Sequence, residues 1–391
     1  MIAKNKGICF WPRLAKQAFP RCQFHVSTHL YARDFAFVFD IDGVLIRGKK
    51  PISQAKAALE LLNRKKVPFI LMTNGGGVSE AEKAAEVVEI TKCSSQISPL
   101  QVVQSHTPMK ALVGNKNFQR VLVVGGDGDN ARKVAYDYAF KDVVMPIDIV
   151  NANKSVAPHS MYTAQDFQKY AKKVDLTKPI DAILVFNDPR DMSSDTQVIQ
   201  DLLNSENGIC GTKRNLKTIK DPTKPSIPIL FSNNDYIYAN DYPLPRFGQG
   251  AFRLATEALY STTNKLSSTQ RLQSVILGKP FKVQYDFAHH VLIDWREKLE
   301  TEDFGADQIL PMLGEAPKTT PFKKIYMVGD NPASDIKGAN DHGWESILVR
   351  TGVFKDEDWA NDIIAKPTAG VFDNVEDAVN AVLRSNGVEI D

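Results

Sequence analysis

The chain has 391 residues, 43% of them hydrophobic and 24% charged, which is the composition of a globular protein long enough for two domains. No apolar run approaches the roughly 18 to 20 residues that a membrane-spanning helix needs, so no membrane span is predicted. The net charge is +2, but residues 34–391 keep 42 of the 48 basic residues against all 46 acidic ones, a net charge of −4. This mildly acidic part argues against nucleic-acid binding, which needs a basic surface.

The first 33 residues have a different composition from the rest of the chain. They contain six basic residues and no Asp or Glu, with apolar residues such as Phe10, Trp11 and Leu14 between them. This pattern predicts a mitochondrial presequence over residues 1–33 and a location in mitochondria, with the matrix as the expected compartment. A disordered basic tail is the alternative. Only Cys93 and Cys210 lie beyond this leader, too few for a disulfide framework or a thiolate metal site.

Apolar runs of strand length alternate with stretches of helical period after the leader. Phe35–Phe39 is the first run, and Ser53–Lys65 carries apolar residues on one helical face. Ser79–Ile90 reads as a second helix, with Ser79 as its N-cap and Glu82 as the capping-box partner. Buried strands alternating with amphipathic helices predict an α/β fold with a parallel sheet covered on both faces. Such sheets bind their ligands at the carboxyl ends of the strands.

The middle of the chain is less regular and richer in proline-containing connections. ILVF (183–186) and IPILFS (227–232) are the expected strands there. We therefore predict a second α/β domain inserted into the first. The expected boundaries are 34–129 for the first part of the core, 130–247 for the inserted domain and 248–391 for the second part of the core.

Acidic residues follow two of the apolar runs directly. Asp40 and Asp42 come after Phe35–Phe39, and Asp330 and Asp335 lie in GDNPASD after the run that begins at Lys324. Carboxylates brought side by side repel one another unless a cation or a proton lies between them. The set is suited to a hard cation with oxygen ligands, most simply Mg²⁺. The plain alternatives are an acidic surface turn and an N-capping Asp, while the glycine spacing excludes an EF-hand.

Groups suited to a phosphate follow two further runs. Thr73 and Asn74 offer a hydroxyl and an amide, and Gly75–Gly77 allow backbone N–H groups to approach an anion closely. Lys279 places one cation between Gly278 and Pro280, after the run SVIL. A single lysine is usually a solvated surface charge. The conjunction of four run ends with complementary groups is what predicts a phosphate site.

These motifs, in this order, resemble the four motifs of the haloacid dehalogenase (HAD) superfamily. The matching segments are DIDGV (40–44), TN (73–74), GKP (278–280) and GDNPASD (329–335). The long segment before GKP resembles the α/β cap of subclass IIA, the group of p-nitrophenyl phosphatase, phosphoglycolate phosphatase and pyridoxal phosphatase. GQGAF (248–252) is similar to the return from cap to core in that group. NDPRDMSSDTQVIQDLL (187–203) resembles a mitochondrial branch named for the cat eye syndrome critical region protein.

The resemblance implies a Rossmann-like HAD core with an inserted cap and a Mg²⁺-dependent phosphohydrolase acting on a small phosphate monoester. It makes Asp40 the nucleophile that forms an aspartyl phosphate and Asp42 the general acid and base. Thr73, Asn74 and Lys279 would then surround the phosphoryl group. The Asp40 carboxylate, the Asp42 main-chain carbonyl and Asp330 would hold Mg²⁺, with Asp335 binding metal waters or Lys279.

Some features depart from the pattern of the family. TNGGG (73–77) has a glycine where many relatives have a second asparagine, which puts one phosphate contact in doubt. The long interval between Lys279 and Asp330 predicts an extra helix, QYDFAHHVLIDWREKLE, in which His289 and His290 are interpreted as solvated or structural.

The loop after IPILFSNND is expected to face the active site in this subclass. The candidate substrate contacts there, equally candidates for plain cap structure, are Tyr236, Tyr238, Asn240 and Arg246. The glycines of VLVVGGDGDN (121–130) do not fit the dinucleotide pattern GxGxxG and are better explained as a crossing into the cap.

Two alternatives to hydrolysis remain open. The chain would keep the fold but mainly bind a phosphorylated metabolite or a protein partner, or it would transfer the phosphoryl group to an acceptor other than water. The second carboxylate, Asp42, favours an enzyme, because a pure binder does not need it. The resemblance also implies a homodimer formed through the cap. The substrate is not readable from the residues.

Overall fold

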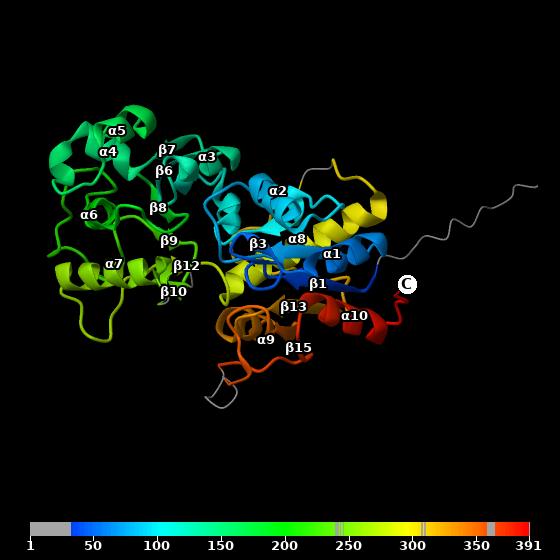
Figure 1. The fold of residues 1–391 in the computed structure, drawn as a ribbon. Helices are drawn as coiled ribbons and strands as arrows, with labels where there is room; N and C mark the ends of the chain where they lie inside the picture. The colour runs from blue at the N-terminus through cyan, green and yellow to red at the C-terminus, as the bar shows by residue number, and fades with distance from the viewer. Residues whose placement is uncertain are drawn as a thin grey trace, which may run out of the picture. The chain divides into compact units, whose positions relative to one another are not determined.

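The computed structural model describes residues 33–238, 242, 244, 246–305, 308, 310–357 and 364–390. Nearly all of the expected presequence (residues 1–32) and Asn240 lie outside the described residues. The described part is an α/β structure with two parallel sheets, as expected (Figure 1). No helix in the described part is both long and apolar enough to cross a membrane.

The six-stranded core sheet contains β1, the run that precedes Asp40. Its strands lie in the order β15-β14-β13-β1-β4-β5, and all paired neighbours are parallel. The chain proceeds from β1 outward through β4 and β5 and later from β13 outward through β14 and β15. The topological switch point therefore lies between β1 and β13, where sheets of this kind bind ligands. The strands are β1 (Phe35–Phe39), β4 (Phe69–Met72), β5 (Val102–Val103), β13 (Lys324–Gly329), β14 (Glu345–Val349) and β15 (Val371–Phe372).

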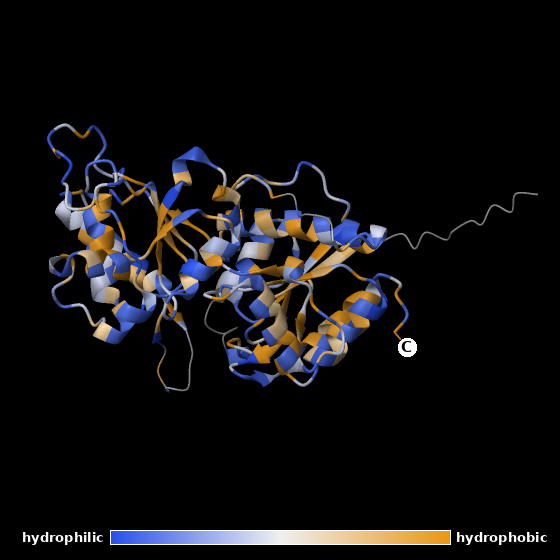
Figure 2. Cartoon of the chain, turned by 90° about the horizontal axis from the view of Figure 1, so that it is seen from above, coloured by the Kyte–Doolittle hydropathy of each residue, from blue (hydrophilic) through white to orange (hydrophobic). Residues whose placement is uncertain are grey.

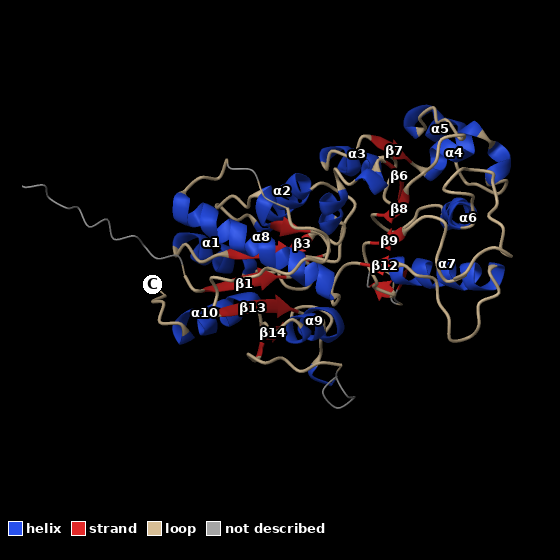
Figure 3. Cartoon of the chain, turned by 180° about the vertical axis from the view of Figure 1, so that it is seen from behind, coloured by secondary structure: helices blue, strands red, loops and turns tan. Residues whose placement is uncertain are grey.

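Helices cover both faces of the core sheet. On one face the three phenylalanines of β1 pack with α1 (Ala55–Arg64), α2 (Glu80–Thr91) and α10 (Val375–Ser385). On the other face Ala36 and Val38 pack with the long α8 (Lys282–Thr301) and the short α9 (Lys337–Asp341). Alternate residues of β1 thus enter different cores, which explains its continuous apolar sequence. Figure 3 shows these helices on either side of the strands.

Local sequence explains how α2 begins. The Ser79 side chain accepts a hydrogen bond from the Glu82 backbone N–H, and the Glu82 side chain accepts from the Ser79 backbone N–H. This reciprocal pair is the expected capping box. It fixes the start of α2 directly after the glycine segment 75–77.

A second sheet of five parallel strands forms the cap. Its order is β12-β9-β8-β6-β7, so its own switch point lies between β6 and β8. The run of apolar residues along each strand is visible in Figure 2. The strands are β6 (Arg120–Val124), β7 (Asp142–Val144), β8 (Ala182–Val185), β9 (Ile229–Phe231) and β12 (Val275–Ile276).

Sheet membership moves both expected domain boundaries. β6 was assigned to the core and β12 to the second part of the core, but both pair with cap strands. The helix that begins in GQGAF, α7 (Gln249–Thr263), packs Phe252 and Tyr260 into the cap core, so this stretch is not the return to the core. The return comes about 30 residues later, at Leu277–Lys282. An apolar strand looks the same in sequence whichever sheet it joins.

The remaining elements are short or cover the cap. Two small hairpins pair β2 (Ile46–Arg47) with β3 (Lys50–Pro51), and β10 (Ile237–Tyr238) with β11 (Arg246–Phe247). The cap helices are α3 (Asn130–Asp137), α4 (Pro146–Ala152), α5 (Ala164–Tyr170) and α6 (Met192–Leu203). The short 3₁₀ segments are η1 (Pro99–Gln101), η2 (Thr107–Leu112), η3 (Lys116–Phe118) and η4 (Lys154–Val156), and η5 (Pro332–Ile336) is a short π-helical segment.

Candidate active site

The two acidic motifs meet at the switch point of the core sheet. Phe39 of β1 is level with Val328 of β13, and the Asp40 backbone N–H continues the ladder by donating to the Val328 carbonyl at 2.9 Å. Asp40 and Asp330 therefore leave neighbouring strands at the same edge. Asp335 reaches the same place from the π-helical turn η5, and carboxylate oxygens of these three buried residues lie within 4.8 Å of one another.

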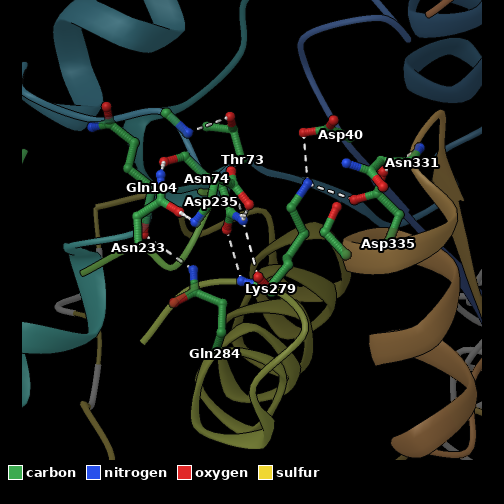
Figure 4. Close-up of polar contacts among 12 residues, drawn as sticks. Asp40, Thr73, Asn74, Gln104, Asn233, Asp235, Lys279, Gln284, Asn331 and Asp335 are labelled. Carbon is green, nitrogen blue, oxygen red and sulfur yellow. Dashed lines mark hydrogen bonds and ion pairs between the residues drawn. The ribbon is translucent and has the colours of Figure 1, made fainter. Parts of the chain in front are cut away.

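Lys279 completes this cluster with the only ammonium among its described members (Figure 4). Its Nζ lies 2.7 Å from Asp40 Oδ1 and 2.6 Å from Asp335 Oδ1, and its side chain is 2% exposed. Burial alone lowers the pKa of Lys279, but the carboxylates of Asp335 and Asp40 outweigh it and raise the pKa. Lys279 is therefore a permanent buried cation that fixes the orientation of both carboxylates.

The charges of the cluster fit a bound divalent cation. Three carboxylates face one ammonium, so the set carries an excess of two negative charges when all are ionised. Burial, followed by repulsion from Asp335, raises the pKa of Asp330 to about 7, and burial raises the pKa of Asp40 well above its usual range. Asp40, Asp330 and Asp335 offer the hard oxygen ligands that Mg²⁺ prefers. These residues would hold it, as the sequence predicts for the acidic motifs.

The backbone at Gly43 and at Gly352 passes close to the Asp330 carboxylate. Its Oδ2 accepts a hydrogen bond from the Val353 N–H at 2.7 Å. A Cβ atom on Gly352 would lie 1.8 Å from this oxygen, and one on Gly43 would lie 2.3 Å from it. Thr351 Oγ1 donates to the Gly43 carbonyl at 2.5 Å and holds the two segments together. Only glycine is therefore sterically compatible with the Asp330 carboxylate at both positions.

Asp42 lies outside the buried cluster, at its rim. Its side chain is exposed, and its Oδ2 is 3.8 Å from the point where a Cβ on Gly75 would be. Atoms packed around the carboxyl raise the pKa of Asp42, although Lys83 and Lys279 oppose this effect. The carboxylate of Asp42 thus lies close to Gly75 of the glycine segment. The expected metal contact of Asp42 was through its main chain, and its carboxylate is not a member of the metal cluster.

The side chain of Asn74, which the sequence predicts as a phosphate contact, forms hydrogen bonds within the protein. Its Oδ1 accepts from the Lys279 backbone N–H at 2.7 Å, and its Nδ2 donates to the Lys279 carbonyl at 3.0 Å and to both oxygens of Asp235 at 3.2 Å. The amide therefore holds the backbone of Lys279 in place. Thr73 Oγ1 is buried and accepts from the Gly75 N–H at 2.9 Å.

The cap contributes polar contacts to this site that sequence reasoning did not single out. Asn233, after β9, donates from Nδ2 to the Asn74 carbonyl at 3.1 Å, and Asn187, after β8, donates to the Gly76 carbonyl at 3.0 Å. Asp235 faces the Asn74 amide. The only indication in the sequence was that polar residues directly follow both cap strands, which is equally typical of loops.

The expected substrate residues lie on the β10–β11 hairpin that follows Asp235. Tyr236, Tyr238 and Arg246 are all exposed there, and the Tyr236 ring packs against the Phe247 ring with centroids 5.5 Å apart. Their exposure beside the site is compatible with both interpretations made from the sequence, substrate contact or cap structure.

The two adjacent histidines on α8 have structural partners. The Nε2 of His289 lies 2.9 Å from Thr320 Oγ1, and the Nε2 of His290 lies 3.0 Å from the Glu315 carbonyl. Neither belongs to the acidic cluster found among the described residues. Both positions agree with the structural interpretation.

Comparison with known proteins gives the family. A model described as haloacid dehalogenase-like hydrolase matches residues 37–141, and one described as HAD-hydrolase-like matches residues 276–378. A Saccharomyces cerevisiae protein named as a mitochondrial hydrolase is 50% identical over 355 residues, which are 90% of this chain and 96% of that protein. The chain belongs to the haloacid dehalogenase-like hydrolases. Together the two matches contain all four motifs, so the family resemblance drawn from these motifs is confirmed.

Other relatives agree with this HAD assignment. A Schizosaccharomyces pombe protein named as a fusion of a CMP-forming cardiolipin synthase with a mitochondrial hydrolase is 36% identical over 345 residues; these are 88% of this chain and about half of that protein. Among solved structures, the p-nitrophenyl phosphatase of Archaeoglobus fulgidus has a TM-score of 0.53, 16% identity, and coverage of 90% of this chain and 99% of its own. A 4-nitrophenylphosphatase of Thermotoga maritima has a TM-score of 0.52 and 16% identity, with 89% and 97% covered. These two structures share the fold.

Proposed function

We propose that this HAD hydrolase is a Mg²⁺-dependent phosphatase that cleaves a small phosphate monoester through an aspartyl-phosphate intermediate. The observation that carries the proposal is the placement of Lys279 between Asp40 and Asp335, with Asp330 in the same buried cluster. A nucleophilic carboxylate, a fixed ammonium and a cation site at one strand edge are what phosphoryl transfer needs, because it depends on positioning and charge stabilisation.

The first step uses the two carboxylates at the end of β1. An oxygen of Asp40 attacks phosphorus and forms an acyl phosphate while the ester P–O bond breaks. Asp42, whose pKa is raised by the atoms packed around its carboxyl, donates a proton from its protonated form to the leaving alkoxide. Lys279 balances charge on the phosphoryl oxygens as the bond breaks, and Mg²⁺, when bound, supplies further positive charge there.

The second step reverses the role of Asp42. As a carboxylate it takes a proton from a water molecule, whose oxygen attacks phosphorus. The bond between phosphorus and Asp40 breaks, which releases inorganic phosphate and restores the Asp40 carboxylate. Splitting one displacement into two lower-barrier steps is the advantage of the covalent intermediate. Asn74 acts in both steps by fixing the backbone of Lys279.

We also propose that the β10–β11 hairpin contacts the part of the substrate that leaves. Tyr236, Tyr238 and Arg246 are exposed on it, and the preceding Asp235 already touches the site through Asn74. Asn240 belongs to the same proposed set. An aromatic hairpin suits a leaving group with an apolar or planar part.

The relatives suggest a compartment and one substrate to try. Both curated relatives are named as mitochondrial hydrolases, which supports import into mitochondria by the expected presequence. One of them is fused to a synthase that forms CMP, and a phosphatase that consumed CMP would draw that reaction forward. CMP therefore belongs in a substrate panel. Import is tested by locating a tagged full chain in cells, and the expected homodimer by light scattering.

The test is phosphatase activity of the full chain on p-nitrophenyl phosphate and a panel of sugar phosphates, glycerol phosphates and nucleoside monophosphates. We expect turnover that requires Mg²⁺ and that falls at least about 10³-fold in Asp40→Asn. Asp201→Asn, an exposed position on α6, is the matched control and should keep full activity.

Mg²⁺ binding is measured separately through thermal unfolding. Mg²⁺ at about 100 times its Kd should stabilise the wild type by about 2.7 kcal/mol. Asp330→Asn should abolish this shift and raise the unfolding midpoint of the metal-free protein, because it removes a buried repulsion. A shift without turnover on any ester would favour the alternative, a HAD-fold protein that only binds a phosphorylated metabolite or a protein partner.

A further inference from the structure

A second buried polar network lies directly behind the glycine segment of the proposed phosphate site. His106 Nε2 accepts from the Gly77 backbone N–H at 3.2 Å, and its Nδ1 lies 2.7 Å from Tyr138 Oη. Tyr138 Oη donates to Glu80 Oε1 at 2.5 Å. The network joins three parts of the protein: the glycine segment, the start of α2 and the cap residue that follows α3.

The direction of each hydrogen bond follows from the chemistry of the groups. The Gly77 N–H is only a donor, so His106 Nε2 carries no proton and Nδ1 carries the proton of the neutral ring. Nδ1–H therefore donates to Tyr138 Oη, whose own proton is directed to the Glu80 carboxylate. Burial lowers the pKa of His106 to about 4, so the ring is neutral at physiological pH. The donor and the acceptor of each hydrogen bond in this network are therefore fixed.

Glu80 is the final acceptor of this hydrogen-bond network. Thr107 Oγ1 also donates to Glu80 Oε1, at 2.7 Å, and Lys110 Nζ lies 3.3 Å from Oε2. Burial raises the pKa of Glu80, but Lys110 and the hydroxyl donors Tyr138 and Thr107 outweigh it, and the net effect lowers the pKa. A permanent carboxylate can only accept, which fixes the proton on Tyr138 and, through it, the tautomer of His106.

The glycine segment is shaped to receive His106. A Cβ on Gly76 would lie 2.7 Å from the imidazole ring, and Gly77 has a φ of +93° that side chains rarely adopt. The ring is also stacked on the cap residue Phe186, with centroids 5.3 Å apart and planes 9° apart. The absence of a side chain at Gly76 therefore leaves room for the His106 ring.

We propose that His106 is a positioning residue: its unprotonated Nε2 holds Gly77 and thereby the phosphate-binding loop, while Tyr138 ties this grip to the docked cap. The inference rests on the proposed phosphatase function. His106 touches neither Asp40 nor Lys279 in the described hydrogen bonds, so it acts through the loop backbone. Two further cap side chains hold neighbouring carbonyls of the loop, Asn233 at Asn74 and Asn187 at Gly76.

The test replaces His106 with Asn or with Gln, because each of these amide side chains can place a polar atom near only one of the two ring nitrogens. Asn places a nitrogen near the Nδ1 position and loses the acceptor for Gly77, whereas Gln places an oxygen near the Nε2 position and keeps it. With p-nitrophenyl phosphate we expect His106→Asn to lower kcat/KM about tenfold and to weaken competitive inhibition by inorganic phosphate by a similar factor. His106→Gln should stay within about threefold of wild type. His159→Asn, an exposed cap position, is the matched control.

Two outcomes overturn the inference. The first is wild-type kcat/KM and phosphate inhibition in His106→Asn. The second is an equal loss in His106→Gln and His106→Asn, since the Gly77 acceptor would then not matter. A purely structural role would lower the unfolding midpoints of both variants without separating their kinetics.

Two further measurements keep the inference testable if His106→Asn does not fold. Tyr138→Phe keeps the ring and removes the hydroxyl, and it should lower kcat/KM about threefold. Exchange of the Gly77 amide hydrogen should be slow in the wild type and faster in Tyr138→Phe. Rapid exchange in the wild type would show that the hydrogen bond from Gly77 to His106 does not hold the loop. If the wild type cleaves no phosphate ester, the proposed function fails, and amide exchange alone decides whether His106 holds the loop.

Discussion

The core sheet and the cap sheet are built alike, yet they carry different chemistry at the same topological position. Each is parallel, each is covered by helices, and each has a switch point beside its first strand. At the core switch point stand Asp40 and Asp330, buried and mutually repelling. The loops at the cap strand ends carry Asn187 and Asn233, neutral amides whose partners are loop carbonyls of the core.

This difference indicates that the residues at a strand edge can supply reactive groups, or can instead hold other residues in position. Clustered carboxylates are costly to bury unless a cation balances them, so the core edge stores the charge that catalysis uses. Amides have no charge to balance and can be buried against backbone carbonyls. The cap edge therefore holds the carbonyls of Asn74 and Gly76 in the core without adding charge to the acidic cluster. Substitutions at the core edge should therefore lower the activity more than substitutions at the cap edge.

The largest loss of activity in the comparison of the two edges is expected from Asp42, at the rim of the acidic cluster in the core. Asp42→Asn removes the proposed general acid and base, and kcat should fall about 10²- to 10⁴-fold. Asp42 is exposed, so the unfolding midpoint should hardly change. Steady-state kinetics and thermal unfolding of the same preparation check both statements. Unchanged kcat would remove Asp42 from the chemistry.

A smaller effect is expected at the cap edge. Asn187→Ala deletes the hydrogen bond to the Gly76 carbonyl, which is worth about 1 kcal/mol, so kcat/KM should fall about fivefold. Asn117→Ala, an exposed position in η3, serves as the control. A loss at Asn187 as large as that of Asp42→Asn would break the comparison, because the cap edge would then take part in the reaction.

The smallest effect is expected on the cap hairpin. Tyr238→Ala should raise KM about threefold for the preferred substrate and leave kcat unchanged, because it removes an aromatic contact to the leaving group without touching the reacting atoms. Tyr136→Ala, another exposed cap tyrosine, provides the reference. Equal KM values for wild type and Tyr238→Ala would assign the hairpin to cap structure alone.

Much of this protein was predictable because its signals are local. A five-residue apolar run followed by acids predicts β1 and Asp40 at a strand end, and β1 spans Phe35–Phe39 as expected. The capping box at Ser79 predicts the start of α2, and the structure shows both of its hydrogen bonds. Each of these inferences depends on neighbours within a few positions along the chain.

The errors arose where distant segments meet. The apolar runs at residues 120–124 and 274–277 indicate strands, but only their hydrogen bonds to neighbouring strands assign them to the cap sheet. The expected phosphate contact of Asn74 stays a prediction, but the sequence did not indicate that its amide pairs with the backbone of Lys279, 205 positions away. His106 carried no sequence signal, because its role depends on Gly77, Tyr138 and Glu80 converging around one ring.

By itself, then, the sequence determined the fold class and the family, and it singled out the acidic residues and the lysine that the structure brings together, because strand periodicity and the four motifs are short-range patterns. Only the tertiary structure decided which strands form the cap, how the backbone of Lys279 is held, and that the His106 ring accepts a hydrogen bond from the Gly77 N–H. The physical reason is that a hydrogen bond between side chain and backbone requires a distance and a direction. Residue order along the chain specifies neither until the sheets have packed.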